Sequence, residues 1–166
     1  MTLIIEDGSQ VTNSNTYVDD AEYVAYAAAR GKTIGLDATA REVELILSMD
    51  YIESFRDQFK GDKTAFDQAL QWPRHSVYID GFPIDFDSIP QELKDAQMEA
   101  GIVNNSTTLL KTGTNQNIQS EKLADMEVSY FSGGSWESVQ TDSIDVKLNV
   151  LLKTSSTGVN AWAFRA

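Results

Sequence analysis

The side chains that could carry acid–base chemistry in this 166-residue chain do not form a complete catalytic set. His75 is the sole histidine, so a Ser-His-Asp triad would have to include it. A triad needs three converging groups, and no nucleophile-elbow pattern surrounds any serine. We therefore interpret His75 as a structural or surface residue and predict that the protein is not an enzyme. A hydrolase is the third and least supported of the functions considered below.

Three aspartates near His75, at positions 80, 85 and 87, offer the oxygen ligands that Ca²⁺ prefers. Their spacing, D-G-F-P-I-D-F-D, does not match an EF-hand loop, and turn chemistry explains Asp80-Gly81 without a metal. The G-K-T at 31–33 lacks the preceding glycine of a phosphate-binding loop. Cysteine is absent, which excludes disulfides, thiol nucleophiles and thiolate metal sites. We predict no catalytic residues, no metal and no cofactor.

The charge balance bears on nucleic-acid binding. The chain has 25 acidic and 13 basic residues, a net charge of −12, and no dense basic cluster. A sequence-independent nucleic-acid binder gains its affinity by neutralising phosphates with Lys and Arg. We therefore expect the isolated chain to bind DNA poorly, and its charge suits a surface past which DNA slides. The same charge would also simply keep a soluble protein dispersed.

All three prolines lie in the segment 59–90, which has no sustained helical or strand period and which we call the proline loop. Long non-periodic segments are usually functional loops or disordered ones, and the aromatic and branched residues here argue against disorder. In Trp72-Pro73-Arg74 the proline restricts the tryptophan to extended backbone and fixes its own φ. We expect Trp72 to anchor the loop to the core and Arg74 to pair with a carboxylate, within the chain or across an interface.

Two further residues of the loop, Asp80 and Phe82, join Arg74 as expected exposed contacts with a neighbouring molecule.

Helical patterns flank the proline loop. A first helix begins after Asp19 or Asp20, with negative charge in its first turn, and stops at Gly31. A second helix begins after Asp37 or Thr39 and continues to about Lys60, ending at Gly61. The expected apolar face of the first helix consists of Ala21, Val24, Ala25 and Ala28.

The second helix carries two apolar stripes. One contains Val43, Ile46, Leu47, Tyr51, Phe55 and Phe59, and the other contains Leu45, Met49 and Ile52. A helix that is apolar on more than one side is widely buried. It is either the central helix of a bundle or a helix with one face on the core and the other on a second subunit. We favour the central helix.

A third helix begins at Pro90, with Ser88 as candidate N-cap, and its face consists of Ile89, Leu93, Ala96, Ala100 and Val103. Residues 111–120 are polar and predict an exposed link, and alternation at 126–130 predicts a strand. Residues 142–153 fit a helix or a strand, and we choose the helix.

The chain is therefore expected to be mainly α: a small bundle of about four helices with a long ordered connector loop, a short β element and a C-terminal arm. The helical domain spans 1–153, with an extended N-terminal segment at 1–16 and the polar loop at 111–120. The arm, 154–166, ends in Trp162, Phe164 and Arg165, residue types common at interface hot spots. We favour a docked arm over a frayed terminus. The chain shows no transmembrane run and no signal peptide.

An ordered set of short motifs points to a family. The set comprises E-D-G at 6–8, Asn13, N-T-Y-V at 15–18, Ala21-Glu22, Tyr26, Arg30-Gly31, Asp50-Tyr51-Ile52, Phe59-Lys60-Gly61, Gln68, Leu70, Trp72-Pro73-Arg74, Asp80-Gly81 and Ile89-Pro90. It resembles the head–tail connector (adaptor, or head-completion) proteins of tailed bacteriophages, many of which are labelled DnaT-like single-stranded DNA-binding proteins. Gln71 departs from the small residue usual before the tryptophan, and past residue 110 the resemblance thins.

The resemblance implies a structural virion protein. Its subunits would form a ring, expected to be dodecameric, between the portal and the tail terminator or stopper (neck) proteins. The ring would extend the channel through which genomic DNA passes without specific binding. The C-terminal arm, with Trp162, Phe164 and Arg165, would reach toward the portal. The expected location is the virion neck, with the host cytoplasm during assembly and no membrane. The alternative is a single-stranded DNA-binding or replication accessory module.

Overall fold

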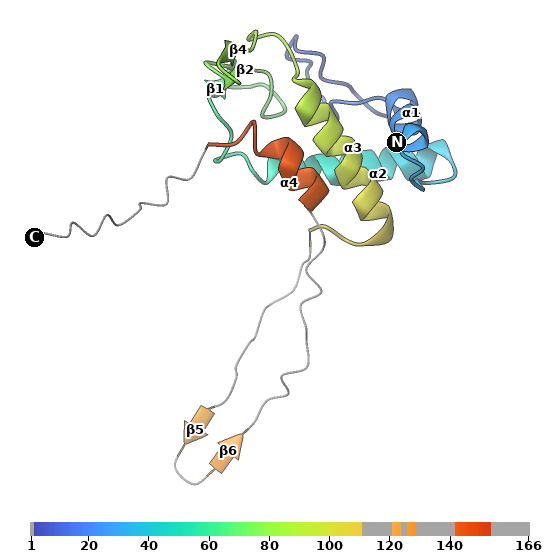
Figure 1. The fold of residues 1–166 in the computed structure, drawn as a ribbon, viewed down its shortest axis with the longest axis vertical. Coiled ribbons are helices and arrows are strands. Elements are labelled where there is room, and N and C mark those ends of the chain that lie inside the picture. Colours follow the sequence, from blue (N-terminus) through green and yellow to red (C-terminus); the bar gives the residue numbers. More distant parts are fainter. Residues whose placement is uncertain (1, 111–120, 124–125, 129–141, 154–166) are drawn as a thin grey trace, which may run out of the picture.

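The protein is mainly α-helical, as its sequence predicts, in a computed structural model that describes residues 2–110, 121–123, 126–128 and 142–153 (Figure 1). Short antiparallel strand pairs accompany the helices. In chain order the elements are α1 (Asp20–Ala29), α2 (Ala38–Glu53), β1 (Asp62–Lys63), β2 (Arg74–His75), β3 (Tyr78–Ile79), β4 (Phe82–Pro83), α3 (Gln91–Ser106), β5 (Glu121–Leu123), β6 (Met126–Val128) and α4 (Asp142–Leu148).

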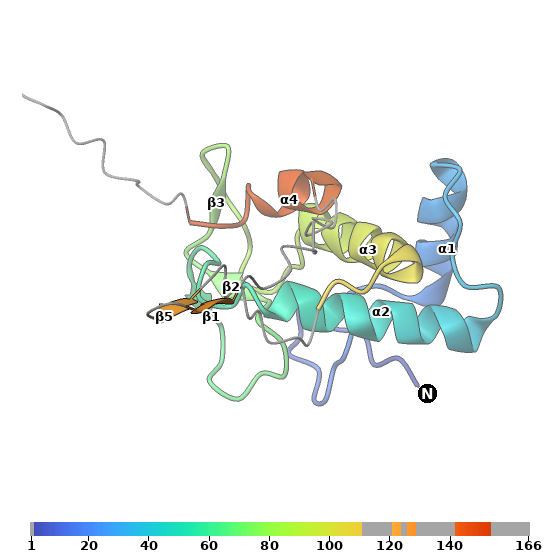
Figure 2. The same cartoon turned by 90° about the horizontal axis from the view of Figure 1, so that it is seen from below.

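Helix α3 is the centre of the helical body. It packs against α2 on one side and against α4 on the other. Figure 2 shows α1 at one end of this body, and the proline loop with β1, β2 and β3 at the opposite end. The helices therefore form a support from which the proline loop projects.

Helix α1 begins as predicted, but it buries a different face. Asp19 accepts a hydrogen bond from the Glu22 amide, and Glu22 reaches back to the Asp19 amide, which completes a capping box. The buried residues are Tyr23, Tyr26 and Ala27, whereas the predicted face of Ala21, Val24, Ala25 and Ala28 is exposed. The tyrosines turn inward because their rings supply more apolar area than alanines, and their hydroxyls find buried carboxylates.

Helix α2 is capped by Asp37, as expected, but it ends at Glu53 and not near Lys60. Beyond Glu53 the backbone hydrogen bonds shift to the i→i−3 pattern. The Ser54 hydroxyl donates to the Tyr51 carbonyl and so competes with the helical hydrogen bond at that carbonyl.

Of the two stripes on α2, the smaller one faces the core. Leu45, Met49 and Ile52 are buried, whereas Val43 and Leu47 are exposed. Of the larger stripe, Ile46, Tyr51 and Phe55 are half-buried and Phe59, which follows the helix, is fully buried, so it is open only at Val43 and Leu47. The central position that we favoured for this helix belongs to α3.

Helices α3 and α4 follow the predicted apolar faces but differ at their starts and ends. Pro90 occupies the N-cap of α3 without a side-chain cap, and the Ser88 hydroxyl bonds to the Asp85 carbonyl, so Ser88 is not the cap. Helix α3 extends to Ser106, beyond the predicted fraying at 104. In α4 Ile144 and Leu148 are fully buried while Val146 is exposed, a spacing that fits a helix and not a strand.

The proline loop is ordered by two short strand pairs. β1 pairs with β2, with Asp62 opposite His75, and β3 pairs with β4, with Tyr78 opposite Pro83. Gly61 lies at φ 64°, and a Cβ there would collide with the His75 carbonyl. A Cβ at Gly8 would collide even more closely with the Asp87 carbonyl, so the N-terminal segment lies directly against the end of the loop.

The hydrophobic core extends from the helices into the proline loop. Trp72 is completely buried and meets Phe59 edge to face, with ring centroids 6.0 Å apart. The chain after α4 closes over this region: Phe59 bridges to Leu152, and the Lys60 amide donates to the Leu151 carbonyl.

Several predicted features lie at or beyond the edges of the described residues. The predicted N-terminal strand is reduced to an isolated bridge between Ile5 and Thr16. β6 coincides with the first part of the strand predicted at 126–130. The polar link at 111–120 and the arm at 154–166, including Trp162, Phe164 and Arg165, fall outside the described residues.

The position of Trp72 gives a first prediction. Trp72→Ala should lower the free energy of unfolding by about 3–5 kcal/mol, because it leaves a large cavity beside Phe59. Urea denaturation followed by circular dichroism measures this change. Phe82→Ala, which removes an exposed ring, should change it by less than about 0.5 kcal/mol. Equal stability of Trp72→Ala and wild type would show that the loop does not depend on this anchor.

Candidate interaction surface

A Tyr–Glu pair, with Tyr17 fully buried and Glu53 half-buried, fixes the base of the proline loop. The Tyr17 hydroxyl donates to Glu53 Oε1 at 3.0 Å, at the end of α2. The same two groups also accept hydrogen bonds from two consecutive backbone amides of the proline loop. The Gln71 amide donates to Glu53 Oε1 at 3.0 Å, and the Trp72 amide donates to Tyr17 Oη at 3.1 Å. The N-terminal segment, α2 and the loop therefore meet at one polar node.

Burial changes the acid–base properties of this node. Burial, together with the Glu53 carboxylate, raises the pKa of Tyr17 well above its ordinary value, so the phenol stays a hydrogen-bond donor. Burial also raises the pKa of Glu53, although the hydrogen bonds from the Gln71 amide and Tyr17 oppose the shift. Two further Tyr–Glu pairs, Tyr23 with Glu44 and Tyr26 with Glu99, join α1 to α2 and α3.

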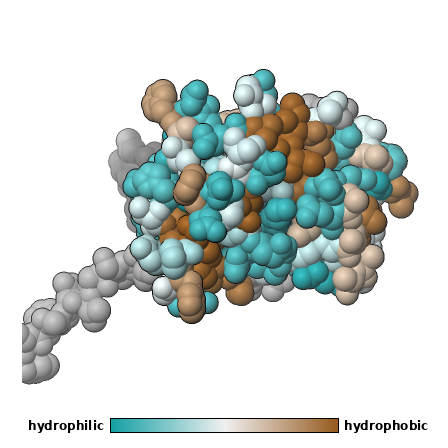
Figure 3. Space-filling view, turned by 90° about the horizontal axis from the view of Figure 1, so that it is seen from above, coloured by the Kyte–Doolittle hydropathy of each residue, from teal (hydrophilic) through white to brown (hydrophobic). Residues whose placement is uncertain are grey.

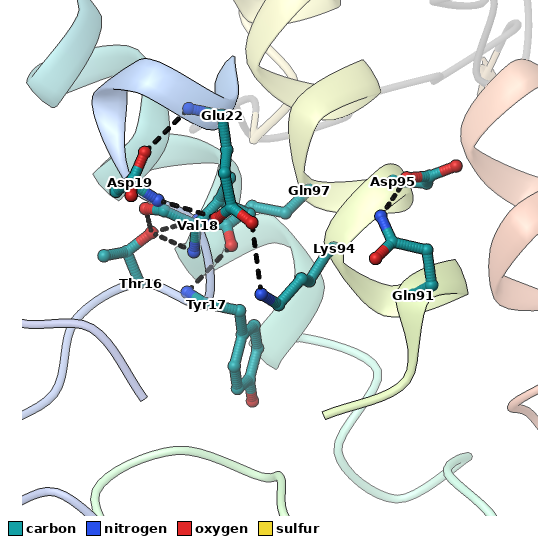
Figure 4. A network of polar contacts seen from close by, with 9 residues as sticks. All are labelled: Thr16, Tyr17, Val18, Asp19, Glu22, Gln91, Lys94, Asp95 and Gln97. Carbon is teal, nitrogen blue, oxygen red and sulfur yellow. Dashed lines mark hydrogen bonds and ion pairs between the residues drawn. The ribbon is translucent and has the colours of Figure 1, made fainter. Parts of the chain in front are cut away.

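Gln97 holds the N-terminal segment against α2 and α3, as Figure 4 shows in part. Its Oε1 accepts the Tyr17 amide at 3.0 Å, and its Nε2 donates to Thr16 Oγ1 and to the Leu45 carbonyl. Lys94, one turn earlier, reaches Glu22 of the α1 capping box at 3.4 Å. Thr16, Tyr17 and Val18 of the N-T-Y-V motif are thereby held in the interior, where the fully buried Gln97 amide group satisfies the Tyr17 amide.

Arg74 does not take the position expected for it. It is buried, and its guanidinium donates to the main-chain carbonyls of Lys60, Gly61 and Gln71 at 2.8, 2.7 and 3.3 Å. Burial lowers the pKa of Arg74. Arg74 therefore holds the two ends of the β1–β2 loop together and is not an exposed contact residue. The turn at Gly61 leaves carbonyls that need a buried donor, and the fork-shaped guanidinium satisfies several at once.

The segment 77–87, which we call the aromatic hairpin, carries the most exposed aromatic residues of the proline loop apart from Phe66. Phe82 is 72% exposed, Phe86 60% and Tyr78 57%. Tyr78 pairs with Pro83, and Phe82 pairs with Ile79, the residue after Tyr78. Successive residues of a strand point to opposite faces, so the Tyr78 and Phe82 side chains lie on opposite faces of the ribbon. Figure 2 shows the hairpin projecting away from the helices.

The aromatic hairpin is held in one conformation. At its base Val77 is buried, and the Ile84 amide donates to the Val77 carbonyl at 3.0 Å. Its two-residue turn, Asp80-Gly81, has φ values of 52° and 85°, the signs that a type I′ hairpin turn requires. Thr64 Oγ1 donates to the Phe86 carbonyl and ties the hairpin to the neighbouring loop.

Phe66 is a separate exposed aromatic residue that the sequence analysis missed. It lies fully exposed in the β1–β2 loop. The buried Gln68 side chain holds this loop together: its Oε1 accepts a hydrogen bond from the Ala65 amide, and its Nε2 donates to the Leu70 and Pro73 carbonyls. The sequence sign of this exposed ring was the glutamine two residues after an isolated Phe in T-A-F-D-Q. A glutamine side chain can close such a loop through hydrogen bonds to its backbone. Figure 3, which views the molecule from above Figure 1, shows hydrophobic areas set among hydrophilic side chains.

The surroundings of the aromatic hairpin are acidic. Between residues 76 and 93 the chain contains Asp80, Asp85, Asp87 and Glu92 and no Lys, Arg or His. The three aspartates are exposed. The hairpin therefore carries exposed aromatic rings together with exposed carboxylates.

Basic side chains elsewhere in the described body are largely engaged by their own chain. Arg41 forms an ion pair with Asp20, and Lys147 forms one with Asp95. Lys60, Lys63 and Lys153 donate to main-chain carbonyls. Arg56, whose side chain is 67% exposed, and Lys32 are exceptions, and the other basic side chains named here are already engaged and less available to a phosphate backbone.

The residues considered for catalysis and metal binding are not brought together. His75 is exposed and contacts Ser76. Within the described ranges no group of three or more His, Asp or Glu side chains is placed to hold a metal ion. Of the expected contact residues, Asp80 and Phe82 are exposed, whereas Pro73 and Trp72 are buried with Arg74.

Fold and surface together define a small, mainly helical protein with a rigid, acidic, aromatic hairpin. The whole chain, residues 1–166, matches the family described as "Putative DnaT-like ssDNA binding protein", and it belongs to that family. That description names single-stranded DNA and does not mention a phage connector. No curated protein and no solved structure matches the chain. None of the helices in the described ranges is long and apolar enough to cross a membrane.

The hairpin turn gives a second prediction. No atom lies near the position of a Cβ at Gly81, so Gly81→Ala tests backbone strain alone. We expect a loss of about 1–2 kcal/mol, because alanine disfavours positive φ, and faster hydrogen exchange at the Ile84 amide. Asp80→Asn should leave both unchanged, since asparagine tolerates this conformation. Unchanged exchange in Gly81→Ala would show that the turn does not hold the hairpin.

The Glu53 node gives a third prediction, on pH dependence. Because its folded-state pKa is raised above the ordinary value of 4.5, the folded protein binds this proton more tightly than the unfolded chain does. The contribution of Glu53 to stability is therefore greatest below that ordinary value and is lost as pH rises through the folded-state pKa. Glu53→Gln keeps an oxygen acceptor for Gln71 and Tyr17 but cannot titrate.

Denaturation of both proteins from about pH 4 to pH 8 measures the effect. We expect the stability of wild type relative to Glu53→Gln to fall as pH rises. Asp57→Asn, at an exposed carboxylate, is the control and should follow wild type. A constant difference across the range would contradict the assigned role.

Proposed function

We propose that this chain is a head–tail connector subunit of a tailed bacteriophage and acts by assembly and not by catalysis. It forms a ring, expected to be dodecameric, between the portal and the tail terminator or stopper proteins in the virion neck. The channel of the ring lets genomic DNA pass without specific binding. The resemblance across the first hundred residues suggests this class of protein. The acidic aromatic hairpin is the observation that favours protein partners over nucleic acid.

The hairpin supports docking to protein because exposed aromatic residues on a preorganised scaffold are typical hot-spot residues. Bases also stack on exposed aromatics, but single-strand binding combines those rings with a positively charged groove. The hairpin has aspartates where such a groove would need Lys or Arg. Its chemistry therefore favours a protein surface.

The exposed side of α1 and α2 supports lateral contacts between subunits. Val24 on α1 and Val43 and Leu47 on α2 are exposed apolar residues, although other apolar residues of these helices already form the core. We assign them to the subunit-to-subunit wall of the ring. The C-terminal arm, with Trp162, Phe164 and Arg165, supplies the axial contact to the portal in this proposal.

The second candidate function is single-stranded DNA binding in replication, which the family description favours. It would require phosphate contacts from basic residues, and its affinity would fall steeply with salt. The two functions thus differ in a property that is simple to measure.

The fourth prediction tests the proposed function. The chain, mixed with purified portal rings of the same phage, should form a complex whose mass corresponds to a ring of subunits on the portal. Leu47→Asp should weaken this assembly without unfolding the chain, because Leu47 is exposed. Native mass spectrometry measures the complex and circular dichroism the fold. A chain that stays monomeric and never joins portal rings would overturn the connector function.

The same preparation separates the second candidate. Titration with short single-stranded DNA at low salt should show no mobility shift. A shift that disappears steeply as salt rises would favour the DNA-binding function instead.

A further inference from the structure

We propose that the aromatic hairpin inserts into a cleft of a partner protein whose walls are apolar and whose mouth is lined by Lys and Arg. Tyr78 and Phe82 would contact the two walls, and Asp80, Asp85 and Asp87 would pair with the basic rim. This inference rests on the proposed function in that the partner is the portal or the stopper protein.

The shape of the hairpin indicates a cleft and not a flat surface. Because Tyr78 and Phe82 point to opposite faces of the ribbon, a flat partner could cover only one of them. Both are more than half exposed. A partner with two facing apolar walls removes both rings from water in one docking event. It therefore gains more hydrophobic free energy than a flat partner that covers one ring.

The rigidity of the hairpin lowers the cost of this insertion. Val77 and the bond from the Ile84 amide root the ribbon in the core, and the Asp80-Gly81 turn closes its tip. A segment that is already ordered loses little conformational entropy when it binds. The exposed rings are therefore presented in the free protein as they would be in the complex.

The charge of the hairpin selects the partner. Asp80 lies at the tip, and Asp85 and Asp87 lie at the base, with no basic residue from 76 to 93. A second copy of this chain, with a net charge of −12, is a poor electrostatic match, and a nucleic acid is worse. A basic protein cleft is complementary in both polarity and charge.

The fifth prediction uses purified portal rings and purified stopper protein as separate probes. Binding is measured by biolayer interferometry in about 50 and about 300 mM NaCl, because screening separates rim charges from buried contacts. Tyr78→Ala/Phe82→Ala should weaken binding to one probe at least about tenfold, as loss of a hot spot does. Phe66→Ala removes a still more exposed ring outside the hairpin and should bind as wild type.

Asp80→Asn/Asp85→Asn/Asp87→Asn should also bind more weakly at low salt and lose most of the salt dependence. If wild type binds and the aromatic double variant binds equally well, the inference is wrong while the proposed function stands. A triple Asn variant with unchanged affinity and salt dependence would rule out the basic rim. If wild type binds neither probe, the proposed function fails, and this docking partner fails with it.

Two other results would also overturn the inference. Loss of self-association in the aromatic double variant, with probe binding intact, would identify a second copy of the chain as the occupant. Loss of single-stranded DNA binding in that variant would assign the rings to base stacking.

Discussion

The partly buried hydrogen bond between Tyr17 and Glu53 is the interaction on which the arrangement of the chain depends. It lies where three segments distant in sequence meet: the N-terminal segment, the end of α2 and the middle of the proline loop. Each polar group at the node satisfies another, which matters because a buried group without a partner costs about 1–3 kcal/mol. The node therefore joins the last residue of α2 to the point where Trp72 enters the core.

Buried polar side chains give this small core its specificity. Glu6 accepts the Gly8 and Gln10 amides and the Ser14 hydroxyl, so one carboxylate folds the N-terminal loop. Gln97 does the same for the segment after it, and Gln68 for the loop that presents Phe66. Apolar packing alone tolerates many arrangements, whereas such directional bonds admit few. The exposed aromatic residues are consequently displayed on a frame of fixed geometry.

The sequence was sufficient for features set by local chemistry. The Asp19 and Asp37 caps, the inward face of α3 and the burial of Trp72 follow from residue type and spacing. The sequence was insufficient where distant groups decide the outcome. The alanine face of α1 is exposed because Tyr23 and Tyr26 find carboxylates on other helices. Arg74 is buried because the turn at Gly61 leaves carbonyls to satisfy, and the exposure of Phe66 depends on Gln68. Periodicity reports none of these long-range bonds.

The closure of the proline loop by the residues after α4 has a consequence for biosynthesis. Ile144, Leu148 and Leu151 are fully buried, and the Lys60 and Lys153 amides complete the contacts between the loop and this late segment. These pairings join residues some ninety positions apart, and such non-local contacts form late. A nascent chain that has emerged only as far as α3 thus exposes an open core. Residues 142–153 therefore complete the core after the helices α1 to α3 have been made.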